Sequence, residues 1–314
     1  MLSDLNFALQ ITTPIFFIIG LGFLFKRIGW LNDDFANMGS ALVFKVTLPC
    51  LLFTKLSTTD FTQGLPTALV IYGFIATLLI FLLLDVFATK LIAQKADKGV
   101  FVQGAFRSNM GIISLAFVVS AYGEKALGIA SIYLAVLTIV FNILSVITLT
   151  RHLPPRGTNR VGGMLLSIIK NPLIISIVAG VLVSLLNIPI PEIALHTGEY
   201  FAGMTLPLAL LCAGASIRIK EFHSSSVLYW SSAMKLIFVP LVFTTGGFIL
   251  GFRGEELGIL YLMCAAPTAA ASYPMVQAMQ GNHFLAAAII AVTSTLSLVT
   301  TTLGIFLLKV FALI

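Results

Sequence analysis

The chain has 314 residues, of which 59% are hydrophobic and 10% are charged, and its mean hydropathy is +1.06. So few charges cannot cover a soluble globular domain, and the composition therefore indicates a protein whose solvent is lipid. The formal net charge of +6 does not indicate nucleic-acid binding, because the basic residues gather on one side of the predicted membrane protein.

The predicted elements are continuous apolar runs, each near the roughly 20 residues that a helix needs to cross a bilayer. Apolar and polar residues do not alternate in them, so they predict helices and not barrel strands. We expect ten transmembrane helices, at residues 8–25, 36–56, 66–89, 100–121, 127–149, 164–187, 200–217, 226–251, 257–280 and 285–312. The longest polar connection runs from Thr150 to Gly163, so no soluble domain is expected.

Basic residues in the connections predict the orientation. The connections after spans 1, 3, 5 and 7 carry eleven of them: Lys26, Arg27, Lys90, Lys95, Lys98, Arg151, Arg156, Arg160, Lys170, Arg218 and Lys220. The opposite side carries four: Lys55, Lys125, Arg253 and Lys309. The positive-inside rule then places both termini outside, in an inner (plasma) membrane of bacterial type. The first apolar run has no basic region before it and no cleavage site, so it predicts an uncleaved span.

The chain repeats itself at a constant offset of 158 residues. Pro14 falls on Pro172, Gly22 on Gly180, Thr47-Leu48-Pro49 on Thr205-Leu206-Pro207, Ser114 on Ser272, and Gly123 on Gly281. We therefore predict two five-helix units, residues 1–157 and 158–314. Because five is odd, the second unit enters the bilayer from the opposite side, which is the inverted repeat of many secondary transporters.

The fourth span of each unit is interrupted by polar and helix-breaking residues, at 106–114 and 266–274. Broken helices are tolerated in lipid only where protein or a water-filled cavity satisfies the freed carbonyls, and their half-helix N-termini attract carboxylates. A proline kink alone is more often packing than function, but a repeated break favours a binding site. The predicted substrate-binding residues are Arg107, Ser108, Asn109, Gly111, Ser114, Pro267, Thr268, Ser272, Tyr273 and Gln277.

Three further prolines, Pro49, Pro207 and Pro274, are predicted to break helices and contribute to gating. Thr47 and Thr205 precede two of them by two residues. Their hydroxyls can satisfy a carbonyl freed by the proline, a structural role that we favour over cavity lining.

Intramembrane charges are the next candidates. Arg107 either holds a carboxylate, of the substrate or of a neighbouring acid, or extends to the cytoplasmic interface. Lys45 and Lys235 either face a cavity or pair with Asp85 or Glu199, the acids nearest to the spans.

The coupling ion is left open. Asp85 and Glu199 are the only acids that could carry a coupling proton, and both are expected near span ends where water keeps them ionised. Oxygen atoms of Asn109, Ser114, Thr268, Ser272 and Gln277 suit Na⁺, and a uniporter is a third alternative. Cys50, Cys212 and Cys264 have no metal-like spacing, so no metal or other cofactor is expected.

Taken in order along the chain, these motifs resemble the auxin efflux carrier family, also called the malate permease type. The resemblance rests on Pro14 with its Ile-Phe run, Leu48-Pro49, Asn109 with Gly111, Asn171-Pro172, Leu206-Pro207 with the small residues 212–216, and Pro267. It implies the fold of bile acid/sodium symporters, with a scaffold part and a transport part that carries two crossed, discontinuous helices. It also implies transport of organic anions such as dicarboxylates or indole acetate.

The sequence departs from the family pattern in two places. Ser114-Leu115-Ala116 stands where the family has Gly-x-Pro, so the first crossing segment lacks its proline, and the long cytoplasmic loop of plant auxin exporters is absent. No enzyme motif or phosphate-binding loop is found, so we predict a secondary transporter for a small mono- or dicarboxylate, not an enzyme. A sensor on the same fold is the alternative, and the chain is compatible with a homodimer.

Overall fold

The computed structural model describes residues 2–58, 66–152, 172–216, 225–279 and 281–314, and these ranges contain helices and no strand. The elements of the first half are α1 (Leu2–Arg27), α2 (Asp33–Leu42), η1 (Val43–Thr47), α3 (Leu48–Ser57), α4 (Thr67–Leu91), α5 (Lys95–Phe106), η3 (Met110–Ser114), α6 (Leu115–Tyr122), η4 (Glu124–Ala126) and α7 (Leu127–His152). Those of the second half are α9 (Pro172–Leu185), α10 (Glu192–Ala215), α11 (Ser226–Ala233), η6 (Met234–Phe238), α12 (Val239–Ile249), α13 (Gly254–Ala265), α14 (Ser272–Ala278) and α15 (His283–Val310).

Six continuous helical segments of the described chain are long and apolar enough to cross a membrane: Ser3–Arg27, Asp33–Ser57, Thr67–Leu91, Glu124–His152, Ser226–Ile249 and His283–Val310. Each overlaps a predicted span. The predicted spans 100–121 and 257–280 are interrupted helices. Part of the predicted span 164–187, and the predicted boundary between residues 157 and 158, lie outside the described residues.

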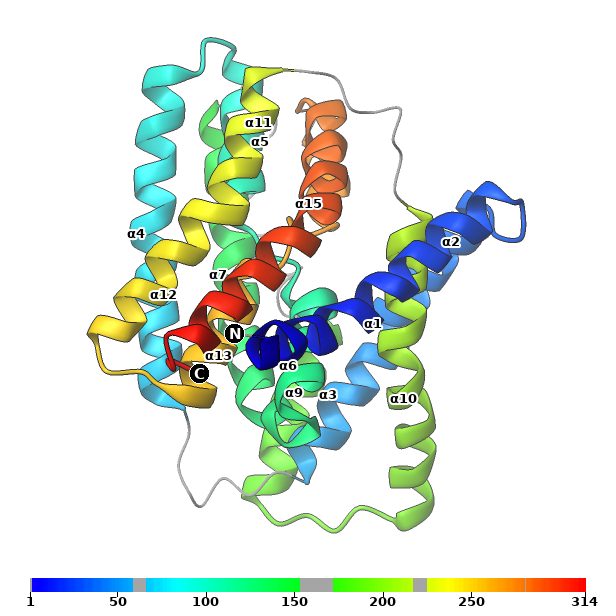
Figure 1. Ribbon diagram of the computed structural model, residues 1–314. Helices are drawn as coiled ribbons and strands as arrows, with labels where there is room; N and C mark the ends of the chain where they lie inside the picture. Colours follow the sequence, from blue (N-terminus) through cyan, green and yellow to red (C-terminus); the bar gives the residue numbers. More distant parts are fainter. Residues whose placement is uncertain (1, 59–65, 153–171, 217–224, 280) are drawn as a thin grey trace.

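The helices form two groups (Figure 1). The first contains α1, α2–α3, α9 and α10, in which α3 packs on α9 and α10 packs on α1, α2 and α3. The second contains α4, α5, α7, α11–α12, α13 and α15, with α5 packed between α4, α7, α11 and α15. The helix α1 bridges the groups, because it also contacts α6 and α15.

One close glycine-to-backbone contact in the first group occurs twice, with the two halves of the chain exchanged. A methyl group added at Gly22 would lie 2.1 Å from the carbonyl oxygen of Leu211, and one added at Gly180 would lie 3.0 Å from that of Phe53. Gly180 is Gly22 plus 158, and Leu211 is Phe53 plus 158. Small residues allow such close approach of helix backbones in membranes. The α1–α10 contact therefore has a counterpart in the α3–α9 contact.

The helix breaks that we expected at Pro49 and Pro207 are absent, so the expectation was wrong for these two prolines, whereas the span that contains Pro274 is interrupted just before it. Pro49 is the second residue of α3, which directly follows the π-helix η1. The chain therefore stays helical, and the helix is only wider over the single turn of η1. The helix α10 continues through Pro207. Pro274 lies in the first turn of α14, where a missing backbone N–H costs no helical hydrogen bond. Gating roles for these prolines stay predictions.

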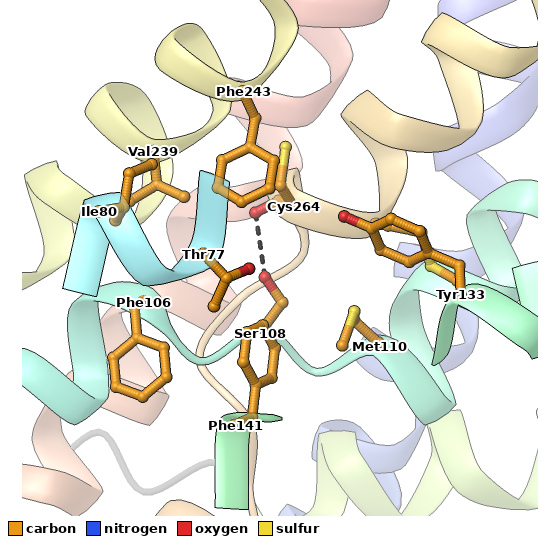
Figure 2. Close-up of a pocket in the computed structure, with 11 residues that line it drawn as sticks. Thr77, Ile80, Phe106, Ser108, Met110, Tyr133, Phe141, Val239, Phe243 and Cys264 are labelled. Carbon is orange, nitrogen blue, oxygen red and sulfur yellow. Dashed lines mark hydrogen bonds between the residues drawn. The ribbon is translucent and has the colours of Figure 1, made fainter. Parts of the chain in front are cut away.

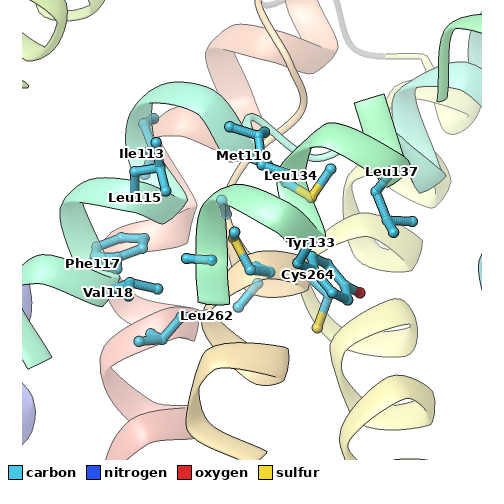
Figure 3. Close-up of a cluster of buried hydrophobic side chains, with 14 of the residues drawn as sticks. Met110, Ile113, Leu115, Phe117, Val118, Tyr133, Leu134, Leu137, Leu262 and Cys264 are labelled. Atoms are coloured by element: carbon cyan, nitrogen blue, oxygen red, sulfur yellow. The ribbon is translucent and has the colours of Figure 1, made fainter. Parts of the chain in front are cut away.

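Part of the buried core is formed by the C-terminal part of the broken fourth span and the helices packed against it. Met110, Ile113, Leu115 and Phe117 of η3–α6 contribute to it, together with Tyr133, Leu134 and Leu137 of α7 and Leu262 of α13 (Figure 3). Four of these eight side chains belong to η3 and α6, which follow the break, and the other four belong to α7 and α13. Packing against α7 and α13 therefore fixes the position of the interrupted segment.

Candidate functional site

Two unwound segments interrupt the helices at the positions that the sequence predicted. The helix α5 ends at Phe106, the next three residues are not helical, and helical structure resumes at Met110. The helix α13 ends at Ala265, and α14 begins only at Ser272. Pro267 has no N–H and disfavours the helical conformation of Ala266, whose φ and ψ are −58° and 152°. The first segment unwinds without a proline, so its extended backbone requires another source of stability.

That stability comes from the second segment. The Asn109 N–H donates to the Pro267 carbonyl over 2.8 Å, and the Ala269 N–H donates to the Arg107 carbonyl over 3.0 Å. Ser108 and Thr268 form an isolated antiparallel bridge between these bonds. Backbone groups that lack helical partners are therefore hydrogen-bonded where residues 107–109 meet residues 267–269, a contact that we call the crossing. Such pairing is required at membrane depth. Asn109 and Pro267 are 158 residues apart, so equivalent positions of the two repeats meet here.

Side chains cap the carbonyls that α13 exposes where it ends. The Ser114 hydroxyl donates to the Met263 carbonyl over 3.3 Å, and the Thr301 hydroxyl of α15 donates to the Ala265 carbonyl over 3.4 Å. The Cys264 carbonyl between them accepts from two groups, which are described next. Thr268 contributes in the same way at the end of α5, because its hydroxyl donates to the Gly104 carbonyl over 2.6 Å. Thr268 and Ser114 of the predicted site thus hold the breaks open.

Lys235 reaches this crossing from the eighth predicted span. Its side chain is fully buried, and its Nζ donates to Ser108 Oγ over 2.5 Å and to the Cys264 carbonyl over 2.7 Å. Ser108 Oγ in turn donates to the same carbonyl over 3.2 Å. The alternative that Lys235 pairs with Asp85 is wrong, because Asp85 binds Arg151 Nη1 at 2.5 Å and His152 Nε2 at 3.0 Å. Lys45 and Glu199 are both exposed.

Arg107 is also buried, with 7% of its surface exposed, so the alternative of an interfacial side chain is wrong. Its guanidinium donates to Asn142 Oδ1 over 2.7 Å, to Ser145 Oγ over 3.4 Å and to Met275 Sδ over 3.2 Å. All three acceptors are neutral. Within the described ranges, no carboxylate lies within 4.0 Å of either Arg107 or Lys235.

A small cavity adjoins the crossing (Figure 2). It is lined by Thr77, Ile80, Phe106, Ser108, Met110, Tyr133, Phe141, Val239, Phe243, Met263 and Cys264. Its free volume has room for about one water molecule. The Thr77 hydroxyl is buried and has no hydrogen-bond partner among the residues described. The cavity is therefore largely apolar, and the Thr77 hydroxyl in its wall can still form a hydrogen bond.

The structure brings the other predicted residues to the crossing unequally. Asn109 and Gly111 are half-buried at the start of η3, and Ser272, at the start of α14, is buried with an unsatisfied hydroxyl. Tyr273 is half-buried, and its ring lies 6.0 Å from the His283 ring. Gln277 is exposed. Substrate binding by all of these residues stays a prediction.

Sequence reasoning undervalued three polar residues. The expected partners of Lys235 are a cavity or one of the acids Asp85 and Glu199, not the Ser108 hydroxyl and the Cys264 carbonyl that it contacts. Asn142 and Ser145 are not among the predicted site residues. These two are three residues apart on the apolar helix α7, so they share one face, and polar side chains on one face of a membrane helix are a usable signal. Their relation to Arg107 was invisible because at least 35 residues separate them in the chain.

Comparison with known proteins identifies the class of protein to which the chain belongs. A family model described as membrane transport protein matches residues 7–161 and 158–305 of the chain. A protein of Methanothermobacter thermautotrophicus, described as an uncharacterized transporter, is 22% identical over 258 residues, which cover 80% of this chain and 82% of the relative. The chain belongs to this membrane transport protein family, the auxin efflux carrier family. It is an integral, multi-pass membrane protein of a transporter family, and not of an enzyme family.

Proposed function

We propose that the protein is a secondary active transporter that moves a small organic anion, a mono- or dicarboxylate, by alternating access, with the substrate bound at the crossing. The observation that carries this proposal is the pair of buried cations, Arg107 and Lys235. Both have neutral hydrogen-bond acceptors and no acidic partner in the described part of the chain.

The electrostatic reason is the cost of unpaired charge in a membrane. A single arginine or lysine at the centre of a transmembrane helix costs about 2.5–3.5 kcal/mol, and such residues normally pair with an acid. Two cations without an acid leave the crossing positive, so an entering carboxylate would be stabilised there. Arg107 can present a bidentate pair of N–H donors to a carboxylate, for which Asn142 and Ser145 serve as replaceable acceptors.

The start of η3 adds a second attraction for an anion. Met110 begins a run of 13 helical residues, Met110–Tyr122, and Asn109 makes no side-chain capping bond to it. The first N–H groups of this run carry partial positive charge, and the half-buried Asn109 amide lies beside them. This arrangement resembles the half-helix N-termini that bind carboxylates in other transporters.

Alternating access requires two halves that exchange conformations. We propose ten spans in two inverted repeats, with both termini outside an inner (plasma) membrane. The exchanged glycine contacts of Gly22 and Gly180, and the meeting of Asn109 with Pro267, support a two-fold relation between the repeats. The cavity has room for about one water molecule, which is too small for a carboxylate. The second helix group, which carries the crossing, must therefore move against the first group before a carboxylate enters.

The test has two stages. Purified protein is first screened by thermal shift against small mono- and dicarboxylates. The best ligand is then used as a radiolabelled substrate for uptake into proteoliposomes. We expect both binding and flux, whereas binding without flux would indicate a sensor.

Variants at Arg107 make the test specific. Arg107→Gln should lower uptake at least about tenfold, and Arg107→Lys should restore it only in part because lysine lacks the planar pair of donors. Arg253→Gln is the matched control, because Arg253 is exposed and bonds only to nearby carbonyls. Normal uptake by a folded Arg107→Gln protein would refute the anion site.

A further inference from the structure

The Lys235 ammonium contacts oxygen atoms of the kinds that also bind metal cations. Its two contacts are a backbone carbonyl, that of Cys264, and a hydroxyl oxygen, that of Ser108. Carbonyl and hydroxyl oxygens are the neutral ligands that hard cations take from proteins. The positively charged Nζ atom lies 2.5 Å from Ser108 Oγ and 2.7 Å from the Cys264 carbonyl oxygen, and the side chain is completely buried.

The position of the Cys264 carbonyl in its helix also favours a cation. Cys264 is the penultimate residue of α13, so its carbonyl belongs to the partially negative C-terminus of a half-helix that ends at the crossing. In transporters with broken helices, such C-termini and unwound carbonyls coordinate the coupling cation. The neighbouring carbonyls of Met263 and Ala265 already accept from Ser114 and Thr301, which leaves the Cys264 carbonyl as the cation ligand.

We propose that the Lys235 ammonium is a built-in cation that occupies the position of a coupling metal ion at the crossing. The protein would then transport its anion without binding Na⁺ there. This inference rests on the proposed transport function and extends it to the ion requirement. Lys235 is a positioning residue in this scheme, because it holds Ser108 and the end of α13 in place and supplies positive charge beside the substrate.

The backbone of the eighth span is shaped to deliver this ammonium. Lys235 lies in the π-helix η6, whose widened turn ends with the Val239 N–H bonded to the Met234 carbonyl, directly before Pro240. Proline removes one N–H and clashes with the carbonyl four residues earlier, which explains the wider turn. Such π-turns occur frequently at functional sites.

A second lysine provides a matched control. Lys45 lies in the π-helix η1, which also directly precedes a proline-containing helix, but its side chain is exposed. Lys45→Ala therefore removes a lysine from the same backbone context without opening a space at the crossing. Lys235→Ala removes the ammonium and leaves the Ser108 and Cys264 oxygens for a free ion.

The experiment measures ²²Na⁺ binding to purified protein by equilibrium dialysis, together with the thermal shift caused by NaCl relative to choline chloride at equal ionic strength. Wild-type protein and Lys45→Ala should show no specific Na⁺ binding and no Na⁺-specific shift. Lys235→Ala should acquire saturable ²²Na⁺ binding and a Na⁺-specific rise in its unfolding temperature. Lys235→Ala/Ser108→Ala, which lacks one of the two oxygens, should bind Na⁺ at least about tenfold more weakly.

The outcomes separate this inference from the proposed function. Specific Na⁺ binding by the wild type, or carboxylate uptake that stops when choline replaces Na⁺, would overturn the built-in cation and leave anion transport intact. A folded Lys235→Ala protein without Na⁺ binding would overturn it as well. Should Lys235→Ala fail to fold, wild-type uptake in Na⁺-free buffer decides: undiminished uptake supports the inference and lost uptake refutes it.

Discussion

The backbone N–H of Asn109 donates a 2.8 Å hydrogen bond to the carbonyl oxygen of Pro267, and the two residues are separated by the repeat offset of 158. In the inverted repeat that we propose, equivalent positions of the two repeats meet at the axis that relates them. Polar side chains from five of the predicted spans gather at this contact, namely Ser108, Asn142, Lys235, Thr268 and Thr301.

The first prediction concerns this pair. Asn109→Ala and Pro267→Ala should each lower carboxylate uptake into proteoliposomes while the amount of protein in the membrane stays unchanged. Asn109 loses its amide beside the start of η3, and an alanine at 267 allows α13 to extend into the crossing. Uptake is measured at equal protein content, and normal transport by both variants would remove the site from the crossing.

The second prediction concerns the support of the break at α5. Thr268→Val keeps the side-chain shape but removes the hydroxyl that donates to the Gly104 carbonyl, and the buried carbonyl is then unsatisfied. This should cost about 1–3 kcal/mol of unfolding free energy and lower the unfolding temperature. Thr295→Val is the control, because Thr295 is exposed and bonds only to its own helix. Equal effects of the two substitutions would contradict a special role for Thr268.

A third prediction tests the close contact between α1 and α10. Gly22→Ala places a methyl group 2.1 Å from the Leu211 carbonyl, so the helices must separate, at a cost of about 1–3 kcal/mol. Gly20→Ala meets no atom within 4 Å and should be neutral or slightly stabilising. The unfolding temperatures of the two purified variants are compared, and a Gly22→Ala protein as stable as Gly20→Ala would be inconsistent with the packing described.

The fourth prediction concerns the ion pairs of Asp85. Its carboxylate is 4% exposed and contacts both the 59% exposed Arg151 and the largely buried side chain of His152, so Asp85→Asn removes two charge-assisted hydrogen bonds and should destabilise the protein by about 1.5–3 kcal/mol. Asp33→Asn breaks the exposed contact with Lys26 and should cost no more than about 1 kcal/mol. Thermal unfolding of both variants provides the comparison. The expectation fails if the Asp33 variant is the less stable.

Apolar length and proline placement fixed much of the architecture before any coordinates. Continuous apolar runs must be helices in lipid, because no water is present to satisfy an open backbone, so the helices over 67–91 and 283–310 could be located from hydropathy alone. The break before Pro267 could be predicted for an equally local reason. The same local rule failed at Pro207, because a proline can be accommodated within a membrane helix when its surroundings satisfy the freed carbonyl.

The hydrogen-bond partners of the buried charged side chains could be found only from the tertiary fold. Lys235 and Ser108 are 127 residues apart, and no periodicity or spacing relates them. The first unwound segment has no proline and owes its extended backbone to hydrogen bonds from a segment of the other repeat. The burial of Arg107 and its choice of hydrogen-bond partners depend on helix packing, whereas hydropathy and helix breaking depend on a residue and its immediate neighbours. Residue type and local order therefore sufficed to locate the membrane helices and both interrupted segments. Helix packing determined which backbone bonds stabilise the first segment and which charged side chains lie at the crossing.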